Sequence, residues 1–322
     1  MTIFKAGLVH TPVTPFTREE RIDYDVYAKL IEFHLRNGAQ SLALPMHAGE
    51  SVSLTDVERQ ELLEFALRQV KGRVPVIAHV SQAGTSLAAT LARHAAQAGA
   101  AAVVATTPYY WTPPASMLLE HFTQIGKAAG IPFFVYNSPQ ESGGVKVTTD
   151  LALKLIDKLD NFAGVVDASL DWQFLIEVIS TAQRVRPQFQ LLTGSEYMIS
   201  AGAIGATAMF APLAGIAPKA VRELWDRCAE EQYEDARPVQ EALAALRQAV
   251  KPAGVVGAER RHAVHEARVR AAAPAARPAR RCRTGGACCG NRRHRRAARW
   301  PARLVARHAK FAAKRARFAY HR

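Results

Sequence analysis

The stretch FAGVVDAS, residues 162–169, is a short apolar run followed at once by residues that commonly open helices. A run of this length is typical of a strand buried on both faces, and Asp and Ser are frequent just before a helix. The same succession recurs along the first 250 residues, and each apolar run suits a parallel sheet covered on both faces. The eight runs are AGLVH (6–10), LALP (42–45), VPVIAHV (74–80), AAVVATT (101–107), IPFFVYN (131–137), FAGVV (162–166), FQLLTG (189–194) and ATAMFA (206–211).

Start and stop signals mark the helices expected between these strands. In the quoted stretch, we expect Asp167 and Ser169 to cap the helix that contains residues 172–179. Elsewhere the signals are Asp23 and Gly38 around one helix, Thr55 and Glu58 as a capping box, and Gly99 and Gly130 after two others.

The alternation predicts the fold class. Eight strand–helix units in roughly 230 residues match the usual size of a (β/α)8 TIM barrel. An open doubly wound sheet is the second choice, because no Gly-rich dinucleotide fingerprint follows any strand. We expect the barrel over residues 1–235, a C-terminal helix over 236–254 and a basic extension over 255–322.

The net charge of +14 is concentrated in that extension. Residues 1–254 hold 22 Lys and Arg against 26 Asp and Glu, whereas residues 255–322 hold 20 against 2. The extension is rich in Arg, Ala and Pro and cannot bury much apolar surface, so we expect it to be disordered. A shifted reading frame in a GC-rich gene gives such a composition; a basic arm that touches nucleic acid is the alternative, and nucleic acid is not expected to bind elsewhere.

Cysteine usage and the N-terminal sequence favour a cytoplasmic protein. Cys228 is the single cysteine before the extension, so no disulfide framework is indicated. The first 16 residues lack the charged and apolar segments of a signal peptide. No apolar run is long enough to span a membrane.

Polar residues gather where the predicted strands end, which is the active-site edge of a barrel. They are His47 and Glu50, His79 and Ser81, Thr106, Thr107, Tyr109 and Tyr110, Tyr136 and Asn137, Asp167, and Ser195 and Glu196. The inward residue at the end of FAGVV is Val166, and no lysine stands at any strand end.

These segments resemble the dihydrodipicolinate synthase and N-acetylneuraminate lyase family of pyruvate-type aldolases. The resemblance covers roughly residues 5–250, with the motifs in family order and at family spacing. The motifs are TPVTPF (11–16), IDYD (22–25), AGES (48–51), GRVPVIA (72–78), TPYY (107–110), VYNSP (135–139), GVVDAS (164–169) and GIAPK (215–219).

The resemblance implies a lyase that acts on a small keto acid or sugar acid without a cofactor. In that chemistry a lysine forms a Schiff base with the keto carbon, and a tyrosine moves the proton. The resemblance places Tyr136 as the proton-relay tyrosine and Tyr110 as a second tyrosine that reaches across a dimer interface. It also implies a homo-oligomer, a dimer or a tetramer. The resemblance, together with the residues at the neighbouring strand ends, gives the expected substrate-binding positions, which are Gly49, Glu50, His79, Thr107, Asn137 and Val166.

Four residues in three motifs depart from the family pattern. His47 and Ala48 stand where the family has a Thr-Thr pair, and Glu141 stands where an arginine often follows the YNxP motif. Val166 occupies the position of the Schiff-base lysine. Valine offers no nucleophile, donor or charge, so we predict that this chain does not work through a Schiff base.

Three hypotheses of function follow. The first is a family lyase without Schiff-base chemistry, with Tyr136, Tyr110 and His47 at the catalytic positions. The second is a lyase or hydrolase that uses His47 and His79, with Glu50 or Glu196 as further ligands of a divalent metal. The simpler interpretation gives each histidine a hydrogen-bonding neighbour at the barrel rim and no metal. The third is a non-catalytic barrel that binds a small ligand.

Two further residues have competing interpretations. Lys146, in the loop after residues 131–137, is the lysine nearest to the strand ends and would be a displaced Schiff-base lysine. A loop lysine is normally solvated and protonated, so we expect it to be inert. Asp167 follows the inward Val166 and should point away from the lumen, as a cap or a structural partner.

Overall fold

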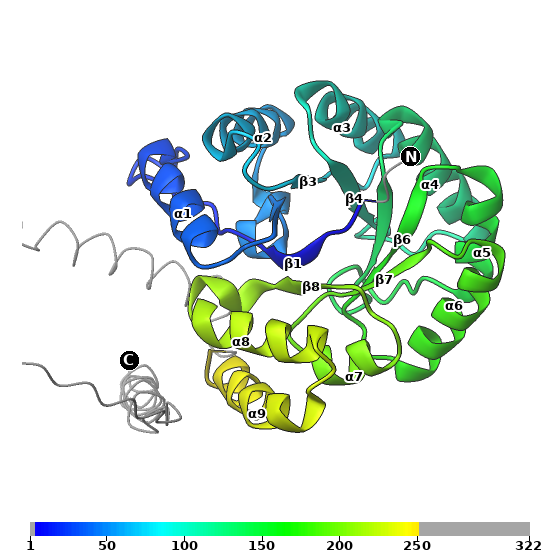
Figure 1. Cartoon of the computed structure of the whole chain (residues 1–322). Coiled ribbons are helices and arrows are strands. Elements are labelled where there is room, and N and C mark those ends of the chain that lie inside the picture. Colours follow the sequence, from blue (N-terminus) through cyan, green and yellow to red (C-terminus); the bar gives the residue numbers. More distant parts are fainter. Residues whose placement is uncertain (1–3, 251–322) are drawn as a thin grey trace, which may run out of the picture. The chain divides into compact units, whose positions relative to one another are not determined.

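The computed structural model describes residues 4–250 and shows a closed barrel of eight parallel strands (Figure 1). The strands pair in chain order, and β1 closes the ring against β8. They are β1 (Gly7–His10), β2 (Ser41–Leu44), β3 (Val76–His79), β4 (Ala102–Thr106), β5 (Phe133–Asn137), β6 (Phe162–Asp167), β7 (Gln190–Thr193) and β8 (Ala208–Ala211). The barrel prediction is therefore confirmed, and each strand falls on one of the eight apolar runs.

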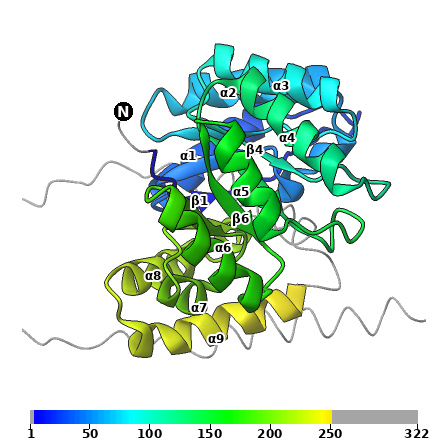
Figure 2. The ribbon, with the colours of Figure 1, turned by 90° about the vertical axis from the view of Figure 1, so that its right-hand side faces the viewer.

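A helix follows each strand and lies on the outside of the ring (Figures 1 and 2). The helices are α1 (Tyr24–Arg36), α2 (Asp56–Val70), α3 (Thr85–Ala98), α4 (Ala115–Ala129), α5 (Thr149–Lys158), α6 (Trp172–Val185), α7 (Met198–Ala203) and α8 (Pro218–Ala229). Three short 3-10 turns, His47–Gly49, Ser51–Ser53 and Pro212–Gly215, lie in the loops.

A ninth helix, α9 (Tyr233–Val250), follows the barrel and packs against α7 and α8 (Figure 2). It begins three residues before the expected start at 236. The expected end at 254 and the extension over 255–322 lie outside the described residues.

The helix ends follow the sequence signals with one exception. Asp23 caps α1, Thr55 and Glu58 form the capping box of α2, and Gly99 and Gly130 end α3 and α4 in the left-handed conformation. The expected cap of α6 at Asp167 and Ser169 is wrong. Asp171 caps this helix by accepting from the Phe174 amide at 3.2 Å, because the loop runs two residues past Ser169 before the helix begins.

The alternation of strand residues builds two apolar layers. One face of each strand packs against the helices, and the other fills the barrel lumen. The lumen holds Val9, Ala43, Ile77, Val104, Phe134, Tyr136, Val166, Leu192 and Phe210, together with smaller neighbours. Gly164 allows β6 to approach β7, since a Cβ there would lie 2.1 Å from the backbone oxygen of Gln190.

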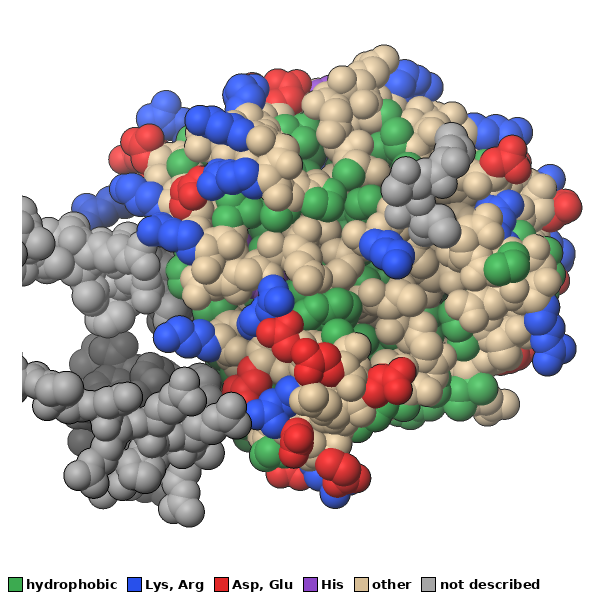
Figure 3. Space-filling model, viewed as in Figure 1, with side chains coloured by type: hydrophobic (Ala, Val, Ile, Leu, Met, Phe, Trp, Pro, Cys, Tyr) green, Lys and Arg blue, Asp and Glu red, His purple; other side chains and the backbone are tan. Residues whose placement is uncertain are grey.

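Charged side chains are spread over the surface in both signs. On the face shown in Figure 3 they lie mainly towards the periphery, with no large patch of one sign. Within residues 4–250, no helix is long and apolar enough to cross a membrane.

Candidate active site

Val166 lies at the centre of the candidate site and is fully buried in the lumen. By strand register its neighbours are Tyr136 on β5 and Leu192 on β7. The space where the resemblance implies a lysine is thus part of a packed apolar layer. This position supplies no group that could form an imine or carry a charge.

Tyr136 is the polar group of this layer. Its ring lies 6.4 Å from that of Phe210, and its side chain is almost fully buried. Burial, with the nearby carboxylates of Glu141, Asp167 and Glu196, raises the pKa of Tyr136 far above its usual range, and Arg247 opposes them. At neutral pH the phenol keeps its proton and can donate a hydrogen bond.

His47 stands in the 3-10 turn after β2 and is largely exposed. Its Nε2 lies 3.7 Å from Oε1 of Glu141, and Glu141 also accepts from the Ser138 hydroxyl at 2.8 Å. Two of the residues that depart from the expected family pattern, His47 and Glu141, are therefore neighbours in the loops after β2 and β5. A contact between two exposed side chains is worth little in stability, so the pair can open for a ligand.

His79 ends β3 and is buried, with Nε2 2.6 Å from Oγ of Ser81. The Ser81 hydroxyl in turn accepts from the Thr106 amide at 2.7 Å. Burial first, and then the charge of Arg59, lowers the pKa of His79 to about 3, so the imidazole is neutral at neutral pH. A hydrogen bond with the backbone of Pro45 opposes this lowering of the pKa.

The geometry around the two histidines favours the simpler interpretation. Over residues 4–250, no group of three or more His, Cys, Asp or Glu side chains is arranged to hold a metal ion. Glu196, suggested as a ligand, is buried elsewhere on the rim, where it accepts from the Leu213 amide at 2.6 Å.

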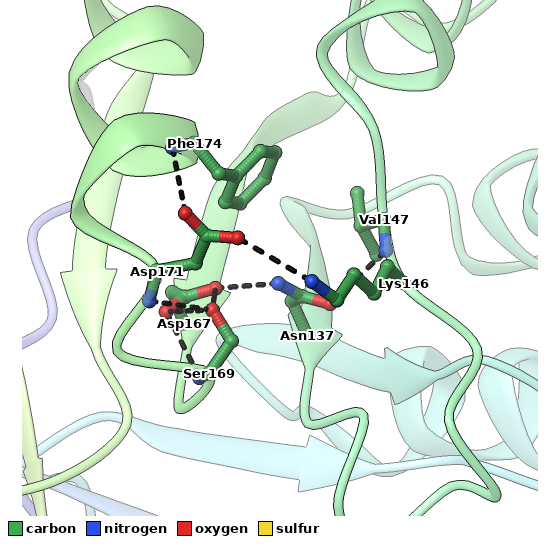
Figure 4. A network of polar contacts seen from close by, with 7 residues as sticks. All are labelled: Asn137, Lys146, Val147, Asp167, Ser169, Asp171 and Phe174. Atoms are coloured by element: carbon green, nitrogen blue, oxygen red, sulfur yellow. Dashed lines mark hydrogen bonds and ion pairs between the residues drawn. The ribbon is translucent and has the colours of Figure 1, made fainter.

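Asp167, at the end of β6, is the centre of a polar network that joins the ends of β5 and β6 (Figure 4). It accepts hydrogen bonds from Asn137 Nδ2 at 2.5 Å and from the amide and hydroxyl of Ser169 at 3.0 Å. Burial raises the pKa of Asp167, and these hydrogen bonds oppose the rise. Asn137 Oδ1 also accepts from the Val147 amide, so this geometry favours a positioning role for Asn137 over direct contact with a substrate.

Lys146 belongs to the same outer network. Its Nζ lies 3.5 Å from Oδ2 of Asp171, and its side chain is mostly exposed (Figure 4). The network places this lysine beside the loops after β5 and β6 and not inside the lumen with Val166.

The remaining predicted site residues lie in the loops after β2 and β4. Gly49 is buried and its carbonyl accepts from the Thr14 hydroxyl at 2.7 Å, while Glu50 adopts a left-handed backbone with φ of 54°. Thr107 is buried, and its hydroxyl has no partner among the described residues. Tyr110 is 99% exposed and also left-handed, with φ of 84°.

The structure adds one group that the sequence reasoning missed. Arg247 of α9 reaches the rim and hydrogen-bonds Oε2 of Glu196 through Nη2. Gln240 of the same helix donates to the carbonyl of Glu196 and accepts from the Ile199 amide. No local pattern pointed to Arg247, because the contact joins residues 51 positions apart.

This combination defines a class: a (β/α)8 barrel whose polar residues converge at the carboxyl ends of its strands, where such barrels hold their active sites. The model of the dihydrodipicolinate synthetase family matches residues 5–270. The chain belongs to this family of class I aldolase-like lyases.

Individual relatives agree with this assignment. The 4-hydroxy-tetrahydrodipicolinate synthase of Bartonella tribocorum is 31% identical over 254 residues, which cover 77% of this chain and 85% of that enzyme. That of Rhodopseudomonas palustris is 34% identical over 249 residues, covering 77% and 82%. The structure of YagE from E. coli K12, a prophage protein of the family in complex with pyruvate, is 25% identical with a TM-score of 0.76, covering 82% and 88%.

Proposed function

We propose that this chain binds a small keto acid or sugar acid at the carboxyl end of its barrel, in the cytoplasm, and does not form a Schiff base with it. The observation that carries the proposal is Val166, buried in the lumen between Tyr136 and Leu192. The family assignment supports the ligand class, and the apolar layer leaves no amine to attack a keto carbon.

Tyr136 keeps its proton at neutral pH, so its hydroxyl can donate a hydrogen bond to an oxygen that gains charge in a lyase reaction. His47 and Glu141 cover the mouth, and in this proposal His47 is the group that accepts a proton. Gly49, Glu50 and Thr107 line the ligand side, with His79 behind them.

A non-catalytic ligand-binding barrel is the second candidate. It is supported by the same valine, because a carbanion next to a keto group needs an electron sink that the lumen side chains do not supply. The two candidates agree on binding and differ in turnover.

The test combines binding with covalent trapping. A thermal-shift series with pyruvate, other 2-oxo acids and sugar acids should raise the melting temperature for at least one carboxylic acid. Borohydride added with pyruvate should leave the intact mass unchanged. A uniformly flat thermal response would remove the ligand proposal, and a reduced pyruvate adduct would remove the claim about the Schiff base.

We further propose that two copies pair through the loop that carries Tyr110. Its neighbour Trp111 is 45% exposed, and Met117 and Leu87 at the starts of α4 and α3 are also exposed. A non-glycine residue held in the left-handed region with its ring in solvent suits a contact made by a second chain. Light scattering should show a smaller assembly for Tyr110→Ala and no change for Val185→Ala, an exposed control on α6. A wild-type monomer would contradict the pairing.

A further inference from the structure

Among the charged groups near Tyr136, the cation is Arg247 of α9, whereas the loop after β5 contributes the acidic Glu141. Of the charged side chains that act on the Tyr136 phenol, Glu141, Asp167 and Glu196 are acidic, and Arg247 is basic. An anionic ligand that approaches Tyr136 would be repelled from the side of Glu141. The cation lies on the side of β7, β8 and α9, where it is paired with Glu196.

Arg247 is held in place by a buried acceptor. Glu196 is 2% exposed and uses Oε1 to accept from the Leu213 amide and Oε2 to accept from Arg247. One carboxylate thereby joins the loop after β7, the turn after β8 and helix α9. Gln240, two turns earlier in α9, fixes the same segment through the Glu196 carbonyl.

The guanidinium has donors to spare. Only Nη2 bonds Glu196, and Nε and Nη1 bond no other side chain or carbonyl in the described part of the chain. The side chain is 25% exposed, so part of the group faces solvent at the rim. A guanidinium carries five N–H donors in a fixed plane and suits two-point contact with a carboxylate.

We propose that Arg247 is the carboxylate-binding residue of this site, so that helix α9 orients the acid group of the ligand towards β7 and β8. The inference rests on the proposed function, because it names the group that holds the acid. It makes the C-terminal helix a part of the site. It also gives the ligand a direction, with its carboxylate on the Arg247 side and its neutral part next to the Tyr136 hydroxyl.

The alternative is that Arg247 only ties α9 to the barrel through Glu196. The two roles differ in what they predict for charged and neutral ligands of the same shape. A structural tie affects both ligands equally, whereas a carboxylate-binding residue affects only the acid.

The experiment measures dissociation constants of pyruvate and of its neutral amide, pyruvamide, for the full chain and its variants. Wild type should bind pyruvate more tightly than pyruvamide. Arg247→Gln should weaken the affinity for pyruvate about tenfold to a hundredfold, as expected for loss of a charged hydrogen bond, and leave the affinity for pyruvamide unchanged. Arg247→Lys keeps the charge without the planar fork, so its affinity for pyruvate should lie between those of wild type and Arg247→Gln. Arg237→Gln, an exposed arginine of the same helix paired with Glu234, is the matched control.

Each outcome decides between the roles. Equal pyruvate affinity in wild type and Arg247→Gln overturns the inference and leaves the proposed ligand class intact. Equal weakening of acid and amide also overturns it, in favour of a structural tie. If wild type binds no carboxylic acid of the thermal-shift series, the inference and the proposed function fail together.

Discussion

Val166 meets the packing requirement of the barrel lumen but offers no group for chemistry. Its place in β6, between Tyr136 and Leu192, requires an apolar or stem-like side chain that fills the lumen, and valine meets that requirement. A lysine there would meet it too, with its methylenes in the layer and its amine above. The barrel of this family therefore forms with a valine at this position of β6.

Val166→Lys should create an amine that reacts with pyruvate. An ammonium in this apolar layer is poorly solvated, which lowers its pKa and exposes a nucleophilic amine next to the Tyr136 hydroxyl. Borohydride trapping followed by mass spectrometry should show an adduct on residue 166 in the variant and none in wild type. Val166→Met, of similar length without an amine, controls for the altered packing. An unmodified lysine in a folded variant would show that the site does not admit the keto acid.

At the scale of the element, sequence patterns predict strands and most caps because their causes are local. A strand buried on both faces needs a short apolar run, and a helix end needs an Asp, a Thr or a Gly at one defined position. The cap of α6 was placed two to four residues too early because three polar residues, Asp167, Ser169 and Asp171, are candidates for it, and only the path of the loop decides between them. The role of Arg247 was missed because the contact depends on how α9 packs, which no local spacing encodes.

Asp171→Ala should destabilise the protein by about 1 kcal/mol, the usual cost of removing an N-cap side chain. Asp171→Asn should cost less, because asparagine caps helices as well as aspartate does and only the 3.5 Å contact with Lys146 is lost. Chemical denaturation measures both, and exposed Asp160→Ala serves as a neutral control. Equal losses for the Ala and Asn variants would show that the ion pair, and not the cap, stabilises this end of α6.

At the scale of the whole molecule, the barrel buries several neutral histidines between its layers. His10 and His34 face each other with their Nδ1 atoms 3.1 Å apart, and His121 bonds Thr85 at 2.9 Å. Burial lowers the pKa of His34 and His121 to about 4, and that of His10 to about 2 with His34 and Arg222 contributing. Together with His79, these rings make the fold sensitive to acid.

Stability should fall steadily as the pH drops below about 6.5. Above that pH the rings are neutral in both states, whereas between about 6.5 and the lowered folded values the unfolded chain binds the extra protons. Each ring then lowers the free energy of unfolding by up to about 1.4 kcal/mol per pH unit. Denaturant titrations between pH 7 and 5 should show this slope, and it should be reduced in His121→Gln, which removes one of the buried rings. Stability that is flat over this range would contradict neutral burial of the rings.

Helix α9 stabilises the barrel, and the extension after residue 254 is not expected to. In α9, Ala236 and Leu243 are buried against the barrel, and Gln240 and Arg247 bond Glu196 on its rim. The extension after residue 254 has the composition of a chain that cannot form a core of its own.

A chain that ends at residue 254 should therefore melt within a few degrees of the full protein. A chain that ends at residue 232 should melt well below it. Without α9, the rim loses both contacts with Glu196, and the apolar face of α8 is exposed. Any binding to DNA should disappear with the first truncation and weaken steeply with salt in the full chain. A large loss of melting temperature on removing only residues 255–322 would show instead that the extension packs on the barrel and that its charge has a structural partner.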